Sequence, residues 1–233
     1  MHPFERARAV GAMFDTIAHR YDLLNRLMSV GQDVRWRRLA VAALTDLPPG
    51  PLLDLGTGTG DLALALRCGV PGRDVVGLDL SAGMLRVGRA KFTARGVQGV
   101  HLVRGDGLHL PFADGAFAGA VTAFTLRNVA DLGAALREVR RVLRPGGAFA
   151  CLEITRPRPG PLATLFGLYF QRLVPAAGGL ISGRPAAYRY LPDSVERFVD
   201  GEELAAALTA AGLRGVQMRR FWPGAVTLHT ARR

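Results

Sequence analysis

The sequence predicts one α/β domain with a doubly wound sheet of seven strands, mostly parallel, whose last strand is antiparallel. Two observations predict this fold. From residue 51 onward, short apolar runs alternate with stretches of helical periodicity, a pattern typical of a parallel sheet covered by helices on both faces. The chain then ends in two consecutive strand patterns. Its 233 residues, 49% of them hydrophobic, suffice for one core, so residues 1–233 are treated as a single domain.

The order of the elements follows from the apolar runs and from the turn residues that separate them. Strands are expected over residues 51–55, 74–80, 99–104, 117–123 and 147–155, with helices over 62–67, 81–94 and 131–143. A helix over 201–211 and strands over 215–221 and 225–230 complete the pattern, with a tight connection at Pro223 and Gly224. This terminal pair suits the antiparallel last strand.

The first 47 residues precede this alternating part and have helical periodicity. Apolar residues recur at helical spacing over 4–19, 22–28 and 33–44, and Asp33 is the expected N-cap of the third helix. We interpret residues 1–47 as a helical lid.

A second helical addition, residues 156–200, is expected to cover the substrate. Its most apolar part, from Pro159 to Gly183, reads as an amphipathic helix that covers the sheet edge and lines an apolar channel. Gln171, Arg172 and Pro175 interrupt it, so it is too short to span a bilayer.

Arginine dominates the basic residues: Lys91 is the only lysine, and the formal net charge is +11. A basic surface can hold a protein near anionic lipid or nucleic acid, or it can be a solvated surface without such a role. The arginines are spread along the chain and aromatics make up 7% of it, so no specific nucleic-acid partner is expected. The sequence leaves membrane contact and oligomeric state open.

The cysteines point to a reducing compartment. Cys68 and Cys151 lie in no cluster with metal-ligand spacing, so no metal site or disulfide is expected, and both should pack as small apolar residues. Residues 1–8 are followed by no apolar run of the signal-peptide kind. We therefore expect a cytoplasmic protein, with peripheral contact at the inner face of the cell membrane left open.

A glycine-rich loop follows the first strand and precedes a helix. Gly56, Gly58 and Gly60 allow the backbone to turn sharply and to approach a ligand without a Cβ in the way. A dinucleotide-binding fingerprint needs glycine or alanine at position 61, where this chain has Asp61. A carboxylate there also disfavours a pyrophosphate at the helix N-terminus, so the loop does not predict NAD binding.

Carboxylates end three successive strands around this loop. Asp79 lies about twenty residues after the loop, where nucleotide-binding α/β folds place a carboxylate that accepts hydrogen bonds from ribose hydroxyls. Asp54 ends the first strand, and Asp106 ends the third, near the expected position of an adenine ring. Each alone is more often a cap or turn former, but their order around the loop predicts a nucleoside site.

The glycine loop, Asp79 and the turn Leu143-Arg144-Pro145-Gly146-Gly147 resemble class I S-adenosylmethionine-dependent methyltransferases, which have a Rossmann-like fold. The resemblance implies S-adenosylmethionine as methyl donor, with its methionine part held by Gly56, Gly58, Thr59 and Gly60. It implies that Asp79 holds the ribose and that Asp106 and Gly107 border the adenine. Asp54 and Leu80 complete the expected donor site.

Four further stretches resemble the ubiquinone/menaquinone biosynthesis C-methyltransferase family over nearly the whole chain. They are Met13 to Asn25, Thr125-Leu126-Arg127-Asn128-Val129, Leu152 to Pro157, and Tyr188 to Val195. The resemblance implies methylation of a ring carbon of a prenylated quinol, with demethylmenaquinol favoured over the benzoquinol of ubiquinone biosynthesis.

Arg127, Asn128 and Tyr21 are the expected catalytic residues. A fixed guanidinium at Arg127 would stabilise the phenolate of the quinol and so make the ring carbon more nucleophilic. Because arginine stays protonated, a water molecule would remove the proton. Asn128 would orient the oxygen or this water, and Tyr21 would hydrogen-bond the other quinol oxygen. Glu153 is either a partner of Arg127 or one half of a buried ion pair that serves the fold.

Three alternatives stay open beside C-methylation. The same fold supports O- or N-methylation of another small molecule, although the His, Lys or metal group that O-methylation usually needs is not evident in the sequence. A nucleic-acid-binding protein would want a basic block with interleaved aromatics. A non-catalytic relative would bind the donor without turnover.

Overall fold

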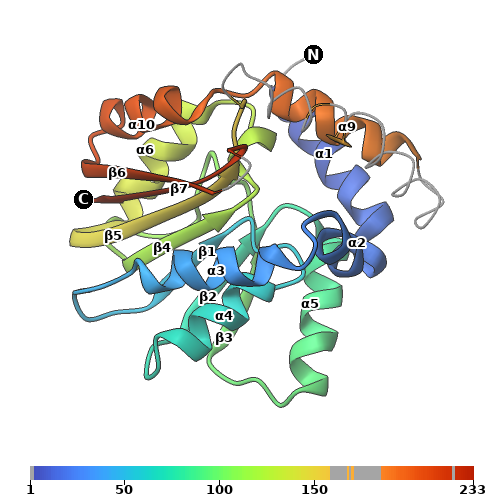
Figure 1. The fold of residues 1–233 in the computed structure, drawn as a ribbon. Coiled ribbons are helices and arrows are strands. Elements are labelled where there is room, and N and C mark those ends of the chain that lie inside the picture. The colour runs from blue at the N-terminus through green and yellow to red at the C-terminus, as the bar shows by residue number, and fades with distance from the viewer. Residues whose placement is uncertain (1–2, 158–166, 168, 171–184, 222–223) are drawn as a thin grey trace.

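The computed structural model describes residues 3–157, 167, 169–170, 185–221 and 224–233, and its strands form one seven-stranded sheet in the order β3-β2-β1-β4-β5-β7-β6 (Figure 1). The strands β1 to β5 pair in parallel, and β7 runs antiparallel to both β5 and β6. The predicted fold class is thereby confirmed. The strands are β1 (Leu52–Leu55), β2 (Val75–Asp79), β3 (Val100–Arg104), β4 (Phe117–Ala123), β5 (Leu143–Ile154), β6 (Arg214–Phe221) and β7 (Val226–Arg232).

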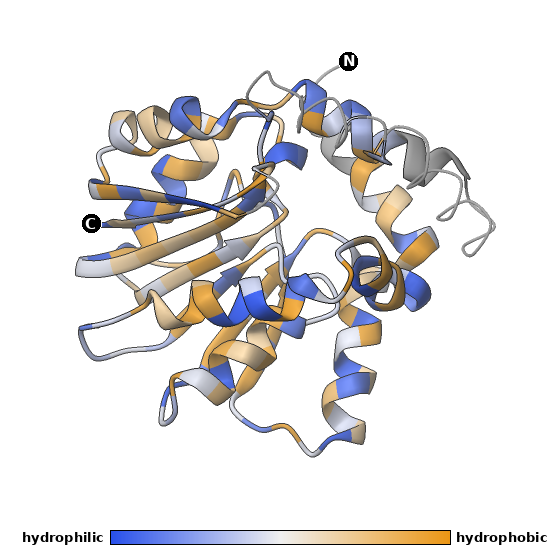
Figure 2. Cartoon of the chain, in the orientation of Figure 1, coloured by the Kyte–Doolittle hydropathy of each residue, from blue (hydrophilic) through white to orange (hydrophobic). Residues whose placement is uncertain are grey.

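Helices cover both faces of the sheet, with α3 and α4 on one face and α6 and α10 on the other (Figure 1). Beneath α3 and α4 lies a core that includes Leu52, Leu66 and Val121, and beneath α6 and α10 one that includes Leu136 and Phe149. Figure 2 shows apolar residues along the central strands, as burial on both faces requires. The helices are α1 (Pro3–Ile17), α2 (Tyr21–Met28), α3 (Gln32–Ala42), α4 (Asp61–Gly69), α5 (Ala82–Ala94), α6 (Leu132–Val142), α9 (Pro185–Glu196) and α10 (Gly201–Ala210).

The strand order positions the site. The chain leaves β1 toward β2 and β3, and then returns to the opposite side of β1 as β4. In such sheets a crevice opens beyond the carboxyl ends of the strands at this reversal, and ligands bind there. The glycine loop after β1, Asp79 at the end of β2 and the loop after β4 therefore meet at one edge.

The N-terminal helices and α9 lie together beyond this edge (Figure 1). Asp15 of α1 attaches them to α5: its Oδ1 accepts hydrogen bonds from Ser81 Oγ at 2.5 Å and from the Gly83 amide at 2.7 Å. Both donors belong to the first turn of α5, where a carboxylate is favoured by the helix dipole. In the described part of the chain, no helix is both long and apolar enough to cross a bilayer.

Three local predictions were wrong. Gly31, at φ +74°, caps α3 in place of Asp33, which is buried and pairs with Arg37 at 2.7 Å. Strand β5 begins at Leu143, four residues before the expected start, because Leu143 pairs with Phe117 of β4. Cys68 is exposed on α4, whereas Cys151 is buried as expected.

Two other predicted features fall outside the described residues. They are most of the expected amphipathic helix from Pro159 to Gly183, and Pro223 of the last connection.

Candidate active site

A cavity lies against the glycine loop, and six of the predicted donor-binding residues line it: Gly56, Gly58, Asp79, Leu80, Asp106 and Gly107. We call it the loop cavity. These residues come from the ends of β1, β2 and β3, so the parallel sheet brings together positions as far apart as Gly56 and Gly107.

Asp79 has both carboxylate oxygens fixed by the backbone. Oδ2 accepts from the Gly58 amide and Oδ1 from the Ser81 amide, each at 2.8 Å. Burial raises the pKa of Asp79, and these amide hydrogen bonds act in the opposite direction. Each oxygen keeps a second lone pair that can accept a hydroxyl of a ligand in the loop cavity.

Gly56 is required by the geometry of the loop. Its φ is +71°, and a Cβ at this position would come within 2.2 Å of the Thr125 side chain. Gly60, at φ +84°, caps α4, and there a Cβ would meet the Phe92 ring at 2.3 Å. Glycine thus serves the close packing of the loop against β4 and α5.

Asp54, Thr59 and Gly60 are not among the residues that line the loop cavity, and the first two instead make hydrogen bonds within and beside the loop. Asp54 is buried and accepts from Thr57 Oγ1 at 2.6 Å. Burial raises the pKa of Asp54 to about 7, although the Thr57 hydrogen bond opposes this. Thr59 donates from Oγ1 to Asp22 of α2 at 2.5 Å, so it connects the loop with the N-terminal helices.

The charge of the loop cavity suits a cationic nucleoside. Asp79 and Asp106 line it, and none of the described residues that line it is lysine, arginine or histidine. A phosphate would meet two carboxylates and no compensating cation there, whereas a sulfonium is attracted. Asp61, at the start of α4, is ion-paired with Lys91 at 2.7 Å and Arg37 at 3.4 Å: burial acts to raise its pKa, but hydrogen bonding and charge from Lys91 lower it overall.

A second cavity, which we call the lid cavity, lies between the N-terminal helices, α9 and the ends of β4 and β5. Its wall is mostly apolar, as a lipid-soluble ligand would require. Polar groups enter it from Tyr21, Asn25, Ser29, Asp33, Arg127 and Tyr190. The apolar lining residues are Met13, Phe14, Ile17, Met28, Trp36, Phe124, Ile154, Tyr169, Phe170, Leu191 and Val226.

Three aromatic residues, Phe14, Tyr21 and Phe124, line both cavities and so separate them. Phe124 follows β4 with φ +60°, a conformation unfavourable for a residue with a bulky side chain. Its carbonyl accepts from Arg127 Nη1 at 2.7 Å and from Asn128 Nδ2 at 3.3 Å. The two predicted catalytic residues thus hold the strained backbone at the boundary between the cavities.

Arg127 is buried at the lid cavity and pairs with Glu153 at the end of β5. Its Nη1 lies 2.6 Å from Glu153 Oε1, and the Glu153 side chain is fully buried. Arg127 Nε has no hydrogen-bond partner among the described residues. A buried donor without a partner is costly unless a ligand satisfies it, so this N–H is a candidate contact for an oxygen in the lid cavity.

Asn128 and Tyr21 complete the polar side of the boundary. Asn128 faces the loop cavity, and its Oδ1 accepts from Tyr190 of α9 at 3.1 Å. Burial raises the pKa of Tyr21, so the phenol stays neutral at pH 7 and can donate a hydrogen bond. Asn25 lies one helical turn from Tyr21, and its buried Nδ2 has no partner in the described part of the chain.

Sequence reasoning did not identify Phe14, Phe124, Asn25 or Tyr190 as site residues. Phe14 and Phe124 look like ordinary core residues, because an apolar residue at a helix face or strand end carries no chemical signal. Tyr190 lies in one of the stretches that carry the family resemblance, and this resemblance is the signal that could have identified it as a site residue. Asn25 ends another such stretch.

Proteins with curated names resemble this chain over nearly its whole length. A demethylmenaquinone methyltransferase from Thermus thermophilus is 48% identical over 221 residues, covering 95% of this chain and 100% of the relative. A ubiquinone/menaquinone biosynthesis C-methyltransferase from Geotalea daltonii is 38% identical, covering 97% of both chains.

Solved structures share the fold at low sequence identity. The [4+2]-cyclase SpnF has a TM-score of 0.69 at 19% identity, covering 97% of this chain and 96% of its own. A SAM-dependent methyltransferase from Thermotoga maritima has a TM-score of 0.64 at 21% identity, covering 95% and 98%. Since a cyclase shares it, the fold alone does not determine the reaction.

Sequence similarity, in contrast to the fold, identifies the family. The family model described as ubiE/COQ5 methyltransferase matches residues 3–233, which include the glycine loop, the Arg127-Asn128 turn and α9. With the loop cavity and the near full-length relatives, this match shows that the chain is an S-adenosylmethionine-dependent methyltransferase and belongs to the ubiE/COQ5 methyltransferase family.

Proposed function

We propose that this protein transfers a methyl group from S-adenosylmethionine to a ring carbon of a prenylated quinol, with demethylmenaquinol as the substrate. The observation that carries the proposal is the pairing of two cavities across Phe14, Tyr21 and Phe124. One cavity is acidic and suits a sulfonium donor. The other is apolar, holds a buried guanidinium and suits a quinol with a long apolar tail.

In the donor site, S-adenosylmethionine would supply an electrophilic methyl group on a sulfonium. Asp79 would accept hydrogen bonds from the ribose hydroxyls, and Leu80, Asp106 and Gly107 would border the adenine. Gly56 and Gly58 would lie along the methionine part. Asp54, Thr59 and Gly60 would fix the shape of the loop, in keeping with their contacts.

In the acceptor site, Arg127 would stabilise the phenolate of the quinol through its unpartnered Nε–H. Tyr21, as a neutral phenol, would donate to the second oxygen, and Asn128 would be held in place by Tyr190. The ring carbon then forms a bond to the methyl group, the carbon–sulfur bond breaks with its electron pair left on sulfur, and water takes the ring proton. Alignment of the two reactants supplies much of the rate.

The names of two relatives favour the naphthoquinol. Relatives at 48% and 42% identity are named demethylmenaquinone methyltransferase. The Geotalea daltonii relative is named for both ubiquinone and menaquinone, which supports benzoquinol as the alternative substrate.

We assign residues 1–47 to a lid and 156–200 to a substrate cover. Because the acceptor is lipid-soluble, we place the protein in the cytoplasm, in peripheral contact with the inner face of the membrane.

The proposal is tested by incubating the protein with methyl-labelled S-adenosylmethionine and reduced short-tail naphthoquinone or benzoquinone. Label on a ring carbon of the naphthoquinol is the expected result, and no label on either quinol would contradict the proposal.

Arg127→Ala should lower turnover about 100- to 1,000-fold while the donor Kd measured by calorimetry stays the same. The control is Arg137→Ala, on the exposed side of α6. Loss of donor binding in Arg127→Ala would instead assign Arg127 a structural role.

A further inference from the structure

The large apolar side chains that are exposed in the described structure lie within eight consecutive residues. Leu23 is 55% exposed, Leu27 is 52% exposed and Val30 is 84% exposed. They belong to α2 and to the turn after it, which lies beyond the carboxyl edge of the sheet (Figure 1). We call these three residues the α2 patch.

The α2 patch lies on the helix face opposite the one that lines the lid cavity. With 3.6 residues per turn, Leu23 and Leu27 share one face of α2, and Val30 follows in the turn after the helix. Tyr21, Asn25 and Met28 fall on the opposite side, where they line the lid cavity. One short helix thus separates the lid cavity from an exposed apolar surface.

Val30 is unusual in its backbone as well as its exposure. Its φ is +51°, in the left-handed region that glycine or asparagine normally occupies in a turn. A β-branched residue is unfavourable there, and its side chain is 84% exposed, so it contributes little to the core. Folding stability therefore does not explain the choice of valine, whereas contact with an apolar partner does.

Positive charges border the α2 patch. Arg20 directly precedes α2 and Arg26 belongs to it; both are exposed, as are Arg35 and Arg38 on the neighbouring α3. Arg26 keeps its side chain 51% exposed while its Nε pairs with Asp33 at 3.4 Å. Apolar side chains flanked by arginine are typical of helices that lie in the interface of an anionic bilayer.

We propose that the α2 patch is the surface by which this protein docks on an anionic lipid bilayer. A second copy of the chain fits less well, because a symmetric contact would bring the same arginines face to face. Three side chains also fall short of the roughly 800 Å² per partner that a stable interface buries. The inference rests on the proposed function in one respect: a lipid-soluble acceptor would reach the lid cavity from the bilayer beside it.

The test is co-sedimentation of the full chain with vesicles of phosphatidylglycerol or of phosphatidylcholine. The wild-type protein should bind the anionic vesicles more tightly. Leu23→Gln/Leu27→Gln should weaken this binding about 100-fold, since each inserted leucine contributes about a factor of ten. Arg20→Gln should weaken it about fivefold, and Arg95→Gln, an exposed charge directly after α5, should not change it.

Val30→Asn separates docking from folding. Asparagine tolerates the left-handed backbone, so the melting temperature should stay the same or rise while vesicle binding falls about tenfold. Unchanged vesicle binding in Leu23→Gln/Leu27→Gln and in Val30→Asn would overturn the proposal. Sedimentation equilibrium that shows a wild-type dimer and a monomeric Leu23→Gln/Leu27→Gln variant, with equal vesicle binding, would assign the patch to a contact between copies and also overturn it.

Activity distinguishes this inference from the proposed function. With a short-tail, water-soluble quinol, Leu23→Gln/Leu27→Gln should turn over at the wild-type rate, and with a long-tail quinol in anionic vesicles it should be about 100-fold slower. Patch-dependent vesicle binding without methylation of any quinol would sustain the docking surface and contradict the proposed function. Quinol methylation without patch-dependent vesicle binding would support the proposed function and contradict the docking surface.

Discussion

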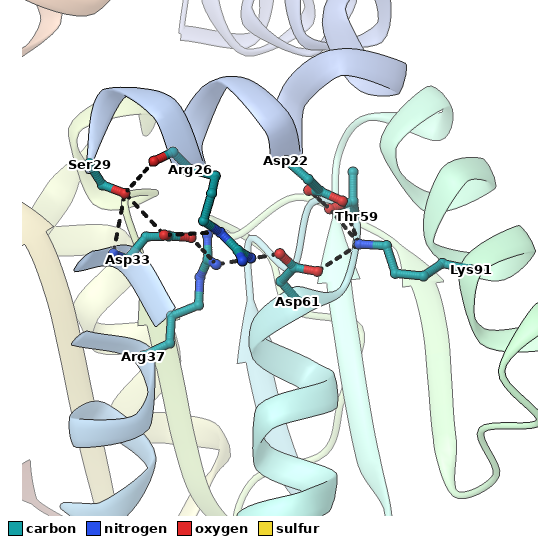
Figure 3. A network of polar contacts seen from close by, with 8 residues as sticks. All are labelled: Asp22, Arg26, Ser29, Asp33, Arg37, Thr59, Asp61 and Lys91. Carbon is teal, nitrogen blue, oxygen red and sulfur yellow. Dashed lines mark hydrogen bonds and ion pairs between the residues drawn. The ribbon is translucent and has the colours of Figure 1, made fainter. Parts of the chain in front are cut away.

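Lys91 of α5 donates from Nζ to Asp22 Oδ2 of α2 at 2.6 Å, and this contact joins the N-terminal helices to α5 (Figure 3). The same ammonium donates to Asp61 Oδ1 at 2.7 Å and to Thr59 Oγ1 at 3.3 Å. Lys91 is the only lysine in the sequence, and its three protons match three acceptors from three segments. The N–H donors of an ammonium can rotate to meet these acceptors, whereas a planar guanidinium donates its hydrogen bonds in fixed directions.

We predict that Lys91→Met loosens the N-terminal helices from the loop. The Lys91 side chain is 13% exposed, so its loss leaves the carboxylates of Asp22 and Asp61 partly buried without this cation. The free energy of unfolding should fall by about 2 kcal/mol, measured by urea denaturation. Donor Kd, measured by calorimetry, should rise about tenfold. Arg86→Met, at an exposed position of the same helix, is the matched control and should change neither. Wild-type values in Lys91→Met would show that the contact is dispensable.

A second prediction concerns the contact between Tyr190 and Asn128. Tyr190→Phe keeps the ring in the lid cavity but removes the hydroxyl that donates to Asn128 Oδ1 at 3.1 Å. With the amide held only by its 3.3 Å hydrogen bond to the Phe124 carbonyl among its described contacts, kcat should fall about tenfold, while donor Kd and the melting temperature stay close to wild type. Single-turnover kinetics with labelled donor measures the chemical step directly. An unchanged single-turnover rate would mean that Tyr190 does not position Asn128.

A third prediction concerns the Arg127–Glu153 ion pair. Glu153→Gln leaves the Arg127 guanidinium buried without its counter-ion, so the free energy of unfolding should fall by about 3 kcal/mol. Turnover should fall as well, because the amide holds Arg127 less firmly, and Glu153→Asp should restore part of both. Donor Kd should not change, since Glu153 does not line the loop cavity. A turnover deficit without any loss of stability would contradict this account of the pair.

Much of the fold and of the loop cavity could be predicted because the signals are local. The glycine loop, the carboxylate after β2 and the alternating apolar runs each occupy a few consecutive residues, and parallel strands must end at a common edge. The strand order then brings Gly56, Asp79 and Asp106 together as the sequence indicated.

The acceptor side could not be predicted this way, because its contacts join distant segments. Asn128 is held by Tyr190, 62 positions away. Asp33 was taken for a cap because its burial at the lid cavity depends on how α2 and α3 pack. The expectation for Arg127 and Asn128 came from the family resemblance, since an arginine after a strand has no chemical signature of its own.

The final prediction follows from the buried carboxyl of Asp54, whose pKa burial raises from 3.8 to about 7, against the opposing effect of the Thr57 hydrogen bond. The folded protein therefore holds this proton over a pH range in which the unfolded chain has released it. The free energy of unfolding should fall as pH rises from about 4 to about 7, at most about 1.4 kcal/mol per pH unit from this group, and the contribution should level off above pH 7. Asp54→Asn should lack this slope, which urea denaturation of both proteins between pH 5 and pH 8 measures as a pH-dependent difference. Asp46→Asn, where the side chain is 91% exposed, is the control and should keep the wild-type slope. Parallel curves for wild type and Asp54→Asn would show that Asp54 stays ionised in the folded protein throughout this range.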